Sequence, residues 1–159
     1  MKNWQKTRNY RRMKDENGNV IAVIGDGSLS GGEALEGLDF AAELQSNFII
    51  IVNDNDMSIA ENHGGLYQNL ALLRKTDGQA ECNLFKAMGL DYVYVDRGND
   101  VAALIKAFKE VKDSTKPVVV HINTLKGKGY APAEKCKEQW HYSGPFDIET
   151  GKPLFDNVE

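Results

Sequence analysis

The sequence predicts an α/β domain with an open, mainly parallel sheet and helices on both faces. Short apolar runs alternate along the chain with longer segments in which apolar residues recur at helical spacing. The run at residues 48–52 is apolar throughout, which is typical of a strand covered on both faces of a parallel sheet. Polar triplets follow the first two apolar runs, at the sheet edge where such folds bind ligands.

Composition indicates one ordinary globular domain. The chain has 159 residues, of which 42% are hydrophobic and 26% are charged. No apolar run approaches the roughly 20 residues of a membrane-spanning helix, and the N-terminus lacks the apolar core of a secretory signal. Cys82 and Cys136 stand far apart and belong to no metal-spaced cluster. We therefore expect a reducing, cytoplasmic setting and no membrane partner.

Positive charge is concentrated at the N-terminus. Residues 1–14 carry six of the 19 Lys and Arg residues and no acid, although the net charge of the chain is −4. Such a basic arm can bind nucleic acid, or it can be a solvated or intersubunit segment. Because the chain contains no recognisable nucleic-acid-binding module, we expect no nucleic-acid partner. The predicted organisation is a basic N-terminal segment, residues 1–18, followed by one domain at residues 19–159.

The first part of the domain is a strand followed by a helix. The strand is predicted at residues 20–24, where five apolar residues follow a turn. The helix is predicted over residues 29–44, with Ser28 or Ser30 as its N-cap and Glu33 in capping-box spacing from Ser30.

The remainder of the domain continues the alternation. The helix at residues 100–112 has the clearest apolar stripe, and Pro117 precedes the last strand. Residues after Thr124 are rich in Gly, Pro and Lys and are predicted to be irregular. Further strands are expected at residues 48–52, 92–95 and 118–122, and further helices at residues 66–74, 81–88 and 100–112.

Two polar triplets mark a candidate metal site. Gly25-Asp26-Gly27 follows the first strand, and Asn53-Asp54-Asn55 follows the second. A strand–helix–strand unit crosses over with a right hand, so the ends of the two strands are expected side by side. Asp26 and Asn55 then offer carboxylate and amide oxygens, which are hard ligands suited to Mg²⁺ or Ca²⁺. The two glycines allow a sharp turn and close approach of a ligand, and the following helix offers free N–H groups to a diphosphate.

A third segment reaches the same edge of the sheet. It runs over residues 123–130 and contains Lys126-Gly127-Lys128-Gly129, a flexible cationic loop. A lysine in such a loop can contact a phosphate, or it can simply face solvent. The sequence thus predicts that metal ligands, N–H donors and a lysine converge on one edge.

Other polar and aromatic residues are expected to serve the fold. Asp54 and Asp56 can hydrogen-bond their own backbone in the loop. His121 lies within a predicted strand and is expected at the edge of the core, and Tyr92 is expected to be a packing residue.

The triplets resemble the fingerprint of thiamin diphosphate enzymes, in which GDG is followed at a set distance by an asparagine motif. Residues 53–59 resemble the NDN-x-MSI run of the 1-deoxy-D-xylulose-5-phosphate synthase family, within the transketolase-like enzymes. Residues 124–135 are similar to that family's T-x-KG-[RK]-GY-x-PAEK segment. Phe85, residues 88–90 and residues 95–96 also match in order, so the resemblance extends over residues 20–155.

The resemblance implies a thiamin diphosphate-binding fold of the transketolase type that is truncated at its N-terminal side. It implies thiamin diphosphate and Mg²⁺ as cofactors. The implied reaction is a transferase step of isoprenoid biosynthesis, a decarboxylating two-carbon transfer from pyruvate to glyceraldehyde 3-phosphate. By the same resemblance, Asp26, Asn55 and the backbone carbonyl of Met57 would bind Mg²⁺, and His141 would be catalytic. The cofactor-binding residues carried over from the family are Gly25, Gly27, Ser28, Ser58, Ile59 and Lys126.

The sequence also departs from the family pattern. Family enzymes carry an upstream half of this domain and a second domain whose glutamate activates the cofactor, and neither is recognised here. Arg97 is inserted, and residues 136–140 differ from the usual approach to the histidine. We therefore expect a split enzyme subunit that needs a partner chain or forms a homo-oligomer through an open sheet edge. The alternatives are a non-catalytic remnant or stand-alone Mg²⁺-diphosphate-binding module and a nucleotide-binding protein, although neither a P-loop nor G-x-G-x-x-G is present.

Overall fold

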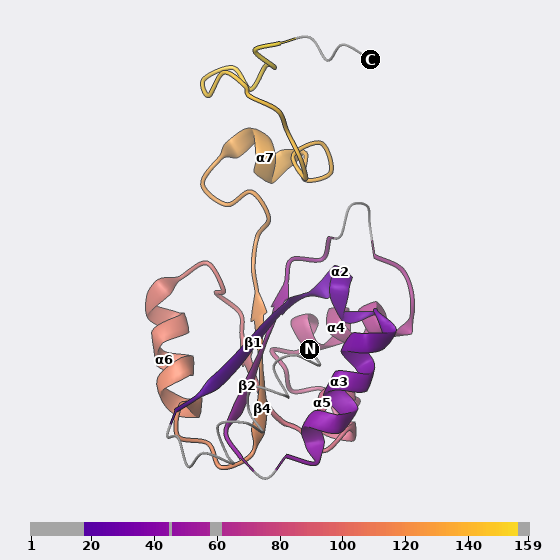
Figure 1. Cartoon of the computed structure of the whole chain (residues 1–159). Coiled ribbons are helices and arrows are strands. Elements are labelled where there is room, and N and C mark those ends of the chain that lie inside the picture. The colour runs from indigo at the N-terminus through magenta and orange to yellow at the C-terminus, as the bar shows by residue number, and fades with distance from the viewer. Residues whose placement is uncertain (1–17, 45, 58–61, 156–159) are drawn as a thin grey trace. The chain divides into compact units, whose positions relative to one another are not determined.

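The computed structural model describes residues 18–44, 46–57 and 62–155. The chain divides into two compact units, Met1–Thr124 and Leu125–Glu159. The sheet belongs to the larger unit (Figure 1). The predicted division into a basic segment and one domain stays a prediction, because residues 1–17 lie outside the described part of the chain.

Four parallel strands form the sheet that the described residues contain. They are β1 (Val20–Gly25), β2 (Phe48–Asp54), β3 (Asp91–Val95) and β4 (Pro117–Asn123), in the spatial order β1-β2-β4-β3. Every neighbouring pair is parallel, and each strand contains the residues that were predicted for it. The prediction of a mainly parallel sheet is therefore confirmed.

Burial follows the position of each strand in the sheet. The central strands β2 and β4 are buried almost throughout, as expected for strands covered on both faces. Along the edge strand β1, buried Val20 and Ala22 alternate with Ile21 and Val23, whose side chains are 42% and 65% exposed. The period of two places one face of β1 on the core and leaves the other face open.

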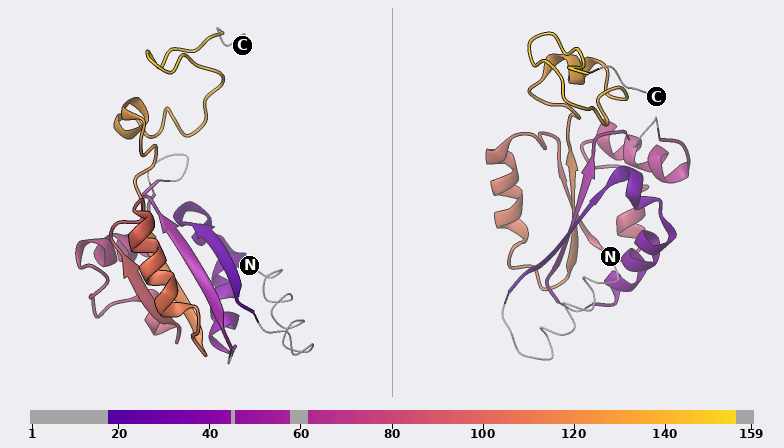
Figure 2. Two further views of the ribbon diagram at one scale, coloured as in Figure 1. Left: turned by 90° about the vertical axis from the view of Figure 1, so that its left-hand side faces the viewer. Right: turned by 45° about the horizontal axis from the view of Figure 1, so that its top comes forward.

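Helices cover both faces of the sheet, as predicted. On one face lie α3 (Gly32–Ala42), α4 (Gly65–Lys75) and α5 (Leu84–Ala87), and on the other lies α6 (Val101–Val111) (Figures 1 and 2). Each face has its own hydrophobic core, because successive side chains of β2 point to opposite faces. The first core includes Ile50, Val52, Leu38, Leu70 and Phe85, and the second includes Ile49, Ile51, Val120, Ala107 and Val111.

The first predicted helix is two helices. A single turn, α2 (Asp26–Leu29), follows β1 directly, and α3 begins after a break. The predicted capping by Ser28 or Ser30 is wrong, because the N-cap of α3 is Gly31 and makes no side-chain hydrogen bond. Ser30 Oγ instead accepts a hydrogen bond from the Tyr67 hydroxyl at 2.8 Å. A tertiary contact has replaced the local cap that this hydroxyl could have made.

The helix predicted at residues 81–88 is shorter than expected, because Asn83 caps it. The buried side-chain oxygen of Asn83 accepts hydrogen bonds from the backbone N–H groups of Phe85 and Lys86, at 3.0 and 3.2 Å. These donors have no partner inside the helix, and an N-cap asparagine satisfies them. The cap fixes the start of α5 and the position of the buried Phe85 beneath it.

The smaller unit contains a helix in a region that was predicted to be irregular. It is α7 (Ala131–Lys135), with Pro132 in its first turn, where a missing N–H is tolerated. Three rings pack together beside it: the centroid distances are 5.1 Å for Tyr130–Trp140, 5.6 Å for Tyr130–Phe146 and 4.6 Å for Trp140–Phe146. Aromatic packing therefore organises a segment that is rich in Gly and Pro.

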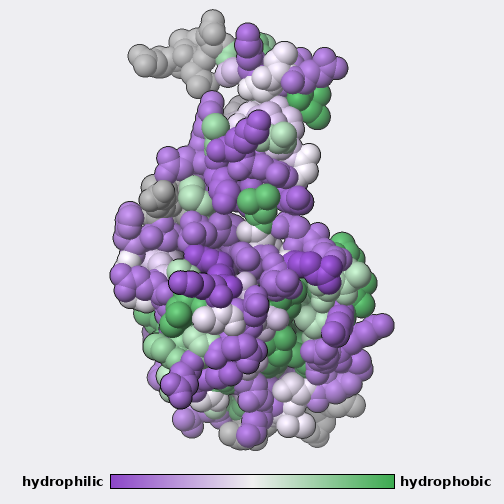
Figure 3. Space-filling view, turned by 180° about the vertical axis from the view of Figure 1, so that it is seen from behind, coloured by the Kyte–Doolittle hydropathy of each residue, from purple (hydrophilic) through white to green (hydrophobic). Residues whose placement is uncertain are grey.

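The outer surface of α6 retains apolar side chains. Figure 3 shows hydrophobic surface on the side of the larger unit where α6 lies, and the exposed residues there include Val101 and Ile105. None of the helices in the described part of the chain combines the length and the apolar character that crossing a membrane requires.

Candidate functional site

The parallel pairing of β1 and β2 brings the two polar triplets together. Gly25, at the end of β1, is the register partner of Asn53 in β2. The next residue, Asp26, is 2% exposed, and its Oδ2 accepts a hydrogen bond from the Met57 backbone N–H at 3.0 Å. The side-chain amide of Asn62 donates to the same oxygen at 3.1 Å. A buried carboxylate is thus held at the carboxyl edge of the sheet by donors from the loop after β2.

The environment of Asp26 disfavours its negative charge. Burial raises the pKa of Asp26, and the nearby Asp54 carboxylate raises it further. The backbone N–H groups of Gly27 and Met57 lower it, but the net shift is upward. A cation beside this carboxylate would relieve the penalty, since opposite charge stabilises the ionised form.

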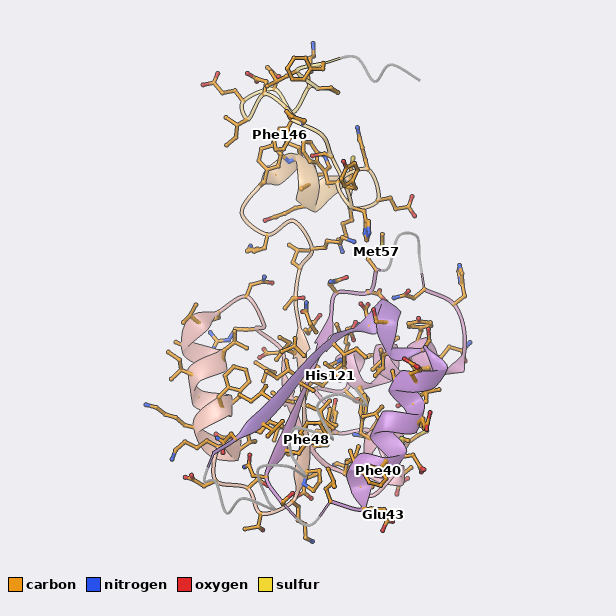
Figure 4. The ribbon with its side chains drawn as sticks, viewed as in Figure 1. Phe40, Glu43, Phe48, Met57, His121 and Phe146 are labelled. Atoms are coloured by element: carbon orange, nitrogen blue, oxygen red, sulfur yellow. The ribbon has the colours of Figure 1, made fainter. Side chains whose placement is uncertain are left out.

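Asn55 carries an unsatisfied acceptor at the same edge. Its side-chain Oδ1 is buried and has no hydrogen-bond partner among the described residues. Leaving such a group unpaired costs about 1–3 kcal/mol, and a hard cation would satisfy it. Met57, which lies beyond the upper end of β2 in Figure 4, adds a backbone carbonyl. Carboxylate, amide and carbonyl oxygens are the ligand types that Mg²⁺ accepts, so the residues present fit this ion.

The ligand set depends on amide and carbonyl oxygens. Within the described ranges, no group of three or more His, Cys, Asp or Glu side chains could hold a metal ion. Soft or imidazole-preferring metals therefore have no cluster of their preferred ligands in that part of the chain.

The glycines of the first triplet do not require an unusual backbone. Gly25 has φ −79° and ψ 154°, which is extended, and neither Gly25 nor Gly27 has a positive φ. The chain does pass directly from β1 into α2 at this point, but the turn does not need angles that only glycine adopts. A Cβ at Gly25 would meet no atom within 4 Å, so the space beside it is open for a ligand. Gly27 and Ser28 belong to α2, whose N-cap makes no side-chain hydrogen bond.

The remaining predicted residues divide into two groups. Ser58 and Ile59 lie outside the described residues. Lys126 and His141 belong to the smaller unit, where Lys126 Nζ lies within hydrogen-bonding distance of His141 Nδ1. The two residues are 15 positions apart in the sequence, and their predicted roles at the site stay predictions.

The sequence reasoning missed the side chains that surround Asp54. The predicted local bond is present, because Asp54 Oδ1 accepts from the Asp56 backbone N–H at 3.1 Å. The same carboxylate also binds Arg74 of α4 and His121 of β4. His121 is fully buried, so its placement at the edge of the core is wrong: both ring nitrogens have partners, the second being the Tyr92 hydroxyl.

Asn62 was also missed, and its contact with Asp26 has no local signal. The loop asparagine stands in an Asn-His-Gly-Gly run that indicates only a turn. Its role depends on the path of the loop after β2, which the residue pattern does not determine.

Comparison with known protein families gives a direct match. Residues 6–83 and 74–124 match the sequence model of the family described as 1-deoxy-D-xylulose-5-phosphate synthase. The chain belongs to the 1-deoxy-D-xylulose-5-phosphate synthase family. The resemblance to this family is therefore confirmed, and the matched residues include both triplets.

Curated members of the 1-deoxy-D-xylulose-5-phosphate synthase family align with most of this chain. The synthase of Porphyromonas gingivalis is 38% identical over 176 residues, covering 87% of this chain and 28% of the relative. Those of Listeria monocytogenes and Myxococcus xanthus are 40% and 41% identical, each covering 89% of this chain and 24% of the relative. The chain thus spans 24% to 28% of the lengths of these synthases.

Solved structures confirm the transketolase-like fold. A variant transketolase from Pichia stipitis superimposes with a TM-score of 0.52 and 25% identity, covering 72% of this chain and 16% of that enzyme. Another variant of that enzyme, in complex with xylulose 5-phosphate, gives a TM-score of 0.51 and 27% identity over 70% of this chain and 16% of that chain.

Proposed function

We propose that this chain is the diphosphate- and Mg²⁺-binding part of a thiamin diphosphate-dependent transferase of the 1-deoxy-D-xylulose-5-phosphate synthase type. The reaction would be the decarboxylating transfer of two carbons from pyruvate to glyceraldehyde 3-phosphate. One observation carries the proposal: the buried Asp26 carboxylate and the unpaired Asn55 Oδ1 lie at the paired ends of β1 and β2. Family membership supports the identity of the cofactor.

Three oxygen ligands would hold the metal. The Asp26 carboxylate supplies charge in a buried setting that raises its pKa, and Asn55 Oδ1 supplies an acceptor that no described protein group uses. The backbone carbonyl of Met57 would complete the set from this chain. Mg²⁺ keeps water or phosphate oxygens in its remaining positions, which matches a metal that links protein to a diphosphate.

Backbone donors and a lysine would bind the phosphate groups. Gly27 and Ser28 would direct N–H groups of α2 at the diphosphate, and Gly25 would leave room for its approach. Lys126 would contact the phosphate region, and Ser58 and Ile59 would line the cofactor by the family pattern. By the family pattern, His141 would be the catalytic residue, and its Nδ1 lies within hydrogen-bonding distance of Lys126 Nζ.

The cofactor supplies the carbon-centred chemistry. When bound, thiamin diphosphate would supply a thiazolium ring whose carbon adds to a keto acid and whose cationic ring takes up the electrons released by decarboxylation. This chain contributes binding and orientation, which is the protein's usual share in a cofactor reaction.

Further catalytic groups would come from a partner chain or from a second copy. Among the described strands β1 lies at the edge of the sheet, and its exposed Ile21 and Val23 leave apolar surface there, which supports this part of the proposal. Both cysteines, Cys82 and Cys136, are free and exposed, which suits a reducing cytoplasm.

Calorimetric titration with thiamin diphosphate, with and without Mg²⁺, tests the proposal. We expect binding that requires Mg²⁺ in the parent chain and is lost in Asp26→Ala. Asp39→Ala is the matched control, since it removes an exposed carboxylate from α3 and should bind as the parent does. Absence of Mg²⁺-dependent binding at millimolar cofactor would contradict the proposal. Mg²⁺-dependent binding without pyruvate decarboxylation in any reconstituted complex would instead favour a non-catalytic binding module.

A further inference from the structure

Asp54 lies next to the proposed metal ligand Asn55 but is itself fully committed to protein groups. Its Oδ1 accepts from the Asp56 backbone N–H at 3.1 Å and from Arg74 Nη1 at 2.7 Å. Its Oδ2 accepts from Arg74 Nη1 at 2.6 Å and from His121 Nε2 at 2.8 Å. A carboxylate offers about four lone-pair positions, so these contacts leave none for a metal. Asp54 is therefore not a ligand, although it is 0% exposed at the end of β2.

Arg74 binds the turn after β2 at two points. One guanidinium nitrogen contacts Asp54, and the other, Nη2, contacts Asp56 at 2.5 Å. Asp56 has φ 61°, in the left-handed region that non-glycine residues rarely adopt. Asn55 lies between these two anchored residues, so the fork of one arginine fixes the backbone that presents its side chain. Lysine could not span both carboxylates in this way, because its charge is a single point.

His121 and Tyr92 extend the network into the middle of the sheet. Asp54 accepts hydrogen bonds from Arg74 and His121, and an ionised carboxylate can only accept. His121 Nε2 must then donate to it, and Nδ1 accepts from the Tyr92 hydroxyl at 2.7 Å. Burial raises the pKa of Tyr92, which keeps its proton available for this bond. Figure 4 shows His121 near the middle of the sheet, away from Met57 at its edge.

The backbone of the turn is tied to the sheet as well. The Thr124 N–H donates to the carbonyl of Asp54 at 2.8 Å, and its hydroxyl donates to Asn53 Oδ1 at 2.7 Å. The Met57 N–H at the other end of the turn donates to Asp26. Every described residue of the turn except Asn55 is thus anchored through a side chain or backbone contact, while Asn55 Oδ1 is left unpaired.

We propose that Arg74 and His121 act through Asp54 as positioning residues, holding residues 54–57 so that Asn55 and Met57 face the metal. The role in metal binding rests on the proposed function. The network replaces the conformational freedom of a loop with a preformed ligand arrangement, and preformed sites bind more tightly because less conformational freedom is lost on binding. The three side chains come from α4, β2 and β4, so residues 54–57 are coupled to the face of the sheet that α4 and α5 cover.

Amide hydrogen exchange measured by NMR without cofactor tests the positioning role. In Arg74→Met, we expect the amides of residues 55–57 to exchange at least about tenfold faster, while amides inside β2 and β4 keep the parent rates. Arg97→Met is the control, because Arg97 pairs with Asp100 on the surface and is 69% exposed. Arg74→Lys keeps the positive charge but cannot contact both carboxylates at once. Amide exchange at residues 55–57 should therefore stay faster than in the parent.

Two results would overturn the positioning role. One is parent-like exchange at residues 55–57 in Arg74→Met; the other is full recovery in Arg74→Lys. If Arg74→Met does not fold, Asp56→Asn removes only the exposed end of the fork, since Asp56 is 63% exposed. It should still accelerate exchange at residues 56–57, and unchanged rates there would also overturn the role.

Titration of the same variants with Mg²⁺ and thiamin diphosphate separates this inference from the proposed function. If the parent binds, Arg74→Met should weaken Mg²⁺-dependent binding at least about tenfold, and Arg97→Met should not. Faster amide exchange without loss of affinity would mean that the network stabilises the turn but does not affect metal binding. That result would contradict its proposed role at the metal. If the parent itself does not bind, the proposed function fails, and the exchange data alone still decide whether the network positions the turn.

Discussion

Asn62 and Asp26 are 36 positions apart in the sequence, and the side-chain amide of Asn62 donates to Asp26 Oδ2 at 3.1 Å. The backbone N–H of Met57 donates to the same oxygen. Two donors on one oxygen fix the orientation of the buried carboxylate, so Asn62 belongs to the support of the site although it is not one of its proposed ligands.

Asn62→Ala should weaken Mg²⁺-dependent cofactor binding. A hydrogen bond to a charged group contributes about 1.5–3 kcal/mol, so we expect a loss of at least about tenfold in affinity by calorimetry. Gln68→Ala removes an exposed amide from α4 and serves as the control. Unchanged affinity in Asn62→Ala would show that the contact does not orient the carboxylate.

Gly25→Ala should separate binding from folding. The backbone angles at Gly25 suit alanine and no atom lies within 4 Å of a Cβ there, so thermal stability should stay close to that of the parent. The new methyl group would occupy the space proposed for the diphosphate, and cofactor binding should fall at least about tenfold. Gly144→Ala, at another open position in the smaller unit, is the control and should bind normally.

Asn83→Ala should lower the free energy of unfolding whether or not a ligand is bound. Loss of an N-cap acceptor costs about 0.5–2 kcal/mol, and urea unfolding would measure the change. Asn83→Ser keeps an acceptor and removes the Asn83 Nδ2 group, which is buried without a hydrogen-bond partner in the described residues. We therefore expect its stability to remain near that of the parent. A serine variant as unstable as the alanine variant would argue against the capping role.

Val23→Lys should reduce self-association through the edge of β1. The parent is expected to be oligomeric in light scattering at micromolar concentration, and a lysine on the exposed face of the edge strand opposes edge pairing. Because Val23 is 65% exposed, the free energy of unfolding should change by no more than about 0.5 kcal/mol. Ile105→Lys on α6 is the control. A monomeric parent chain would contradict the predicted assembly.

Thr150→Ala should change the titration of Asp147 in the smaller unit. The Thr150 hydroxyl and backbone N–H lower the pKa of Asp147, and the hydroxyl bond is 2.7 Å long. A lowered folded-state pKa stabilises the fold at pH values above the unfolded-state pKa, and this contribution is lost as the pH falls through the folded-state value. NMR titration of the Asp147 carboxyl carbon should show the pKa rise toward its ordinary value in Thr150→Ala. Thr115→Ala, at an exposed position, should leave it unchanged.

Much of the fold could be predicted from the apolar runs of the strands and from the right-handed crossover between parallel strands. Continuous apolar runs such as residues 48–52 identify central strands, and the right-handed crossover between β1 and β2 explains why Asp26 lies close to the loop after β2. The helix after β1 was harder, because Ser30 had two possible partners. The local cap was visible in the sequence, whereas the Tyr67 hydroxyl, 37 positions away, was not.

The support of the site could not be predicted from local patterns. Arg74 reaches Asp54 only because α4 begins at Gly65 and places its last turn beside the end of β2. A single histidine in a strand indicates no partner, and the burial of His121 depends on groups from β2 and β3. The oxygen groups of the proposed metal ligands are thus visible in the sequence at Asp26 and Asn55, while the contacts that orient Asp26 and the turn beside Asn55 are long-range.

The sheet order also implies a sequence of events during synthesis. β1 and β2 can pair as soon as the second strand has left the ribosome, so Asp26 can meet the loop after β2 early. Asp54, however, is separated by 67 positions from its partner His121 on the neighbouring strand β4. Until that strand emerges, Asp54 can contact Arg74 but lacks the hydrogen bond from His121 and the cover of β4. Residues 54–57 therefore become fully rigid only near the end of translation of the larger unit, when β4 inserts between β2 and β3.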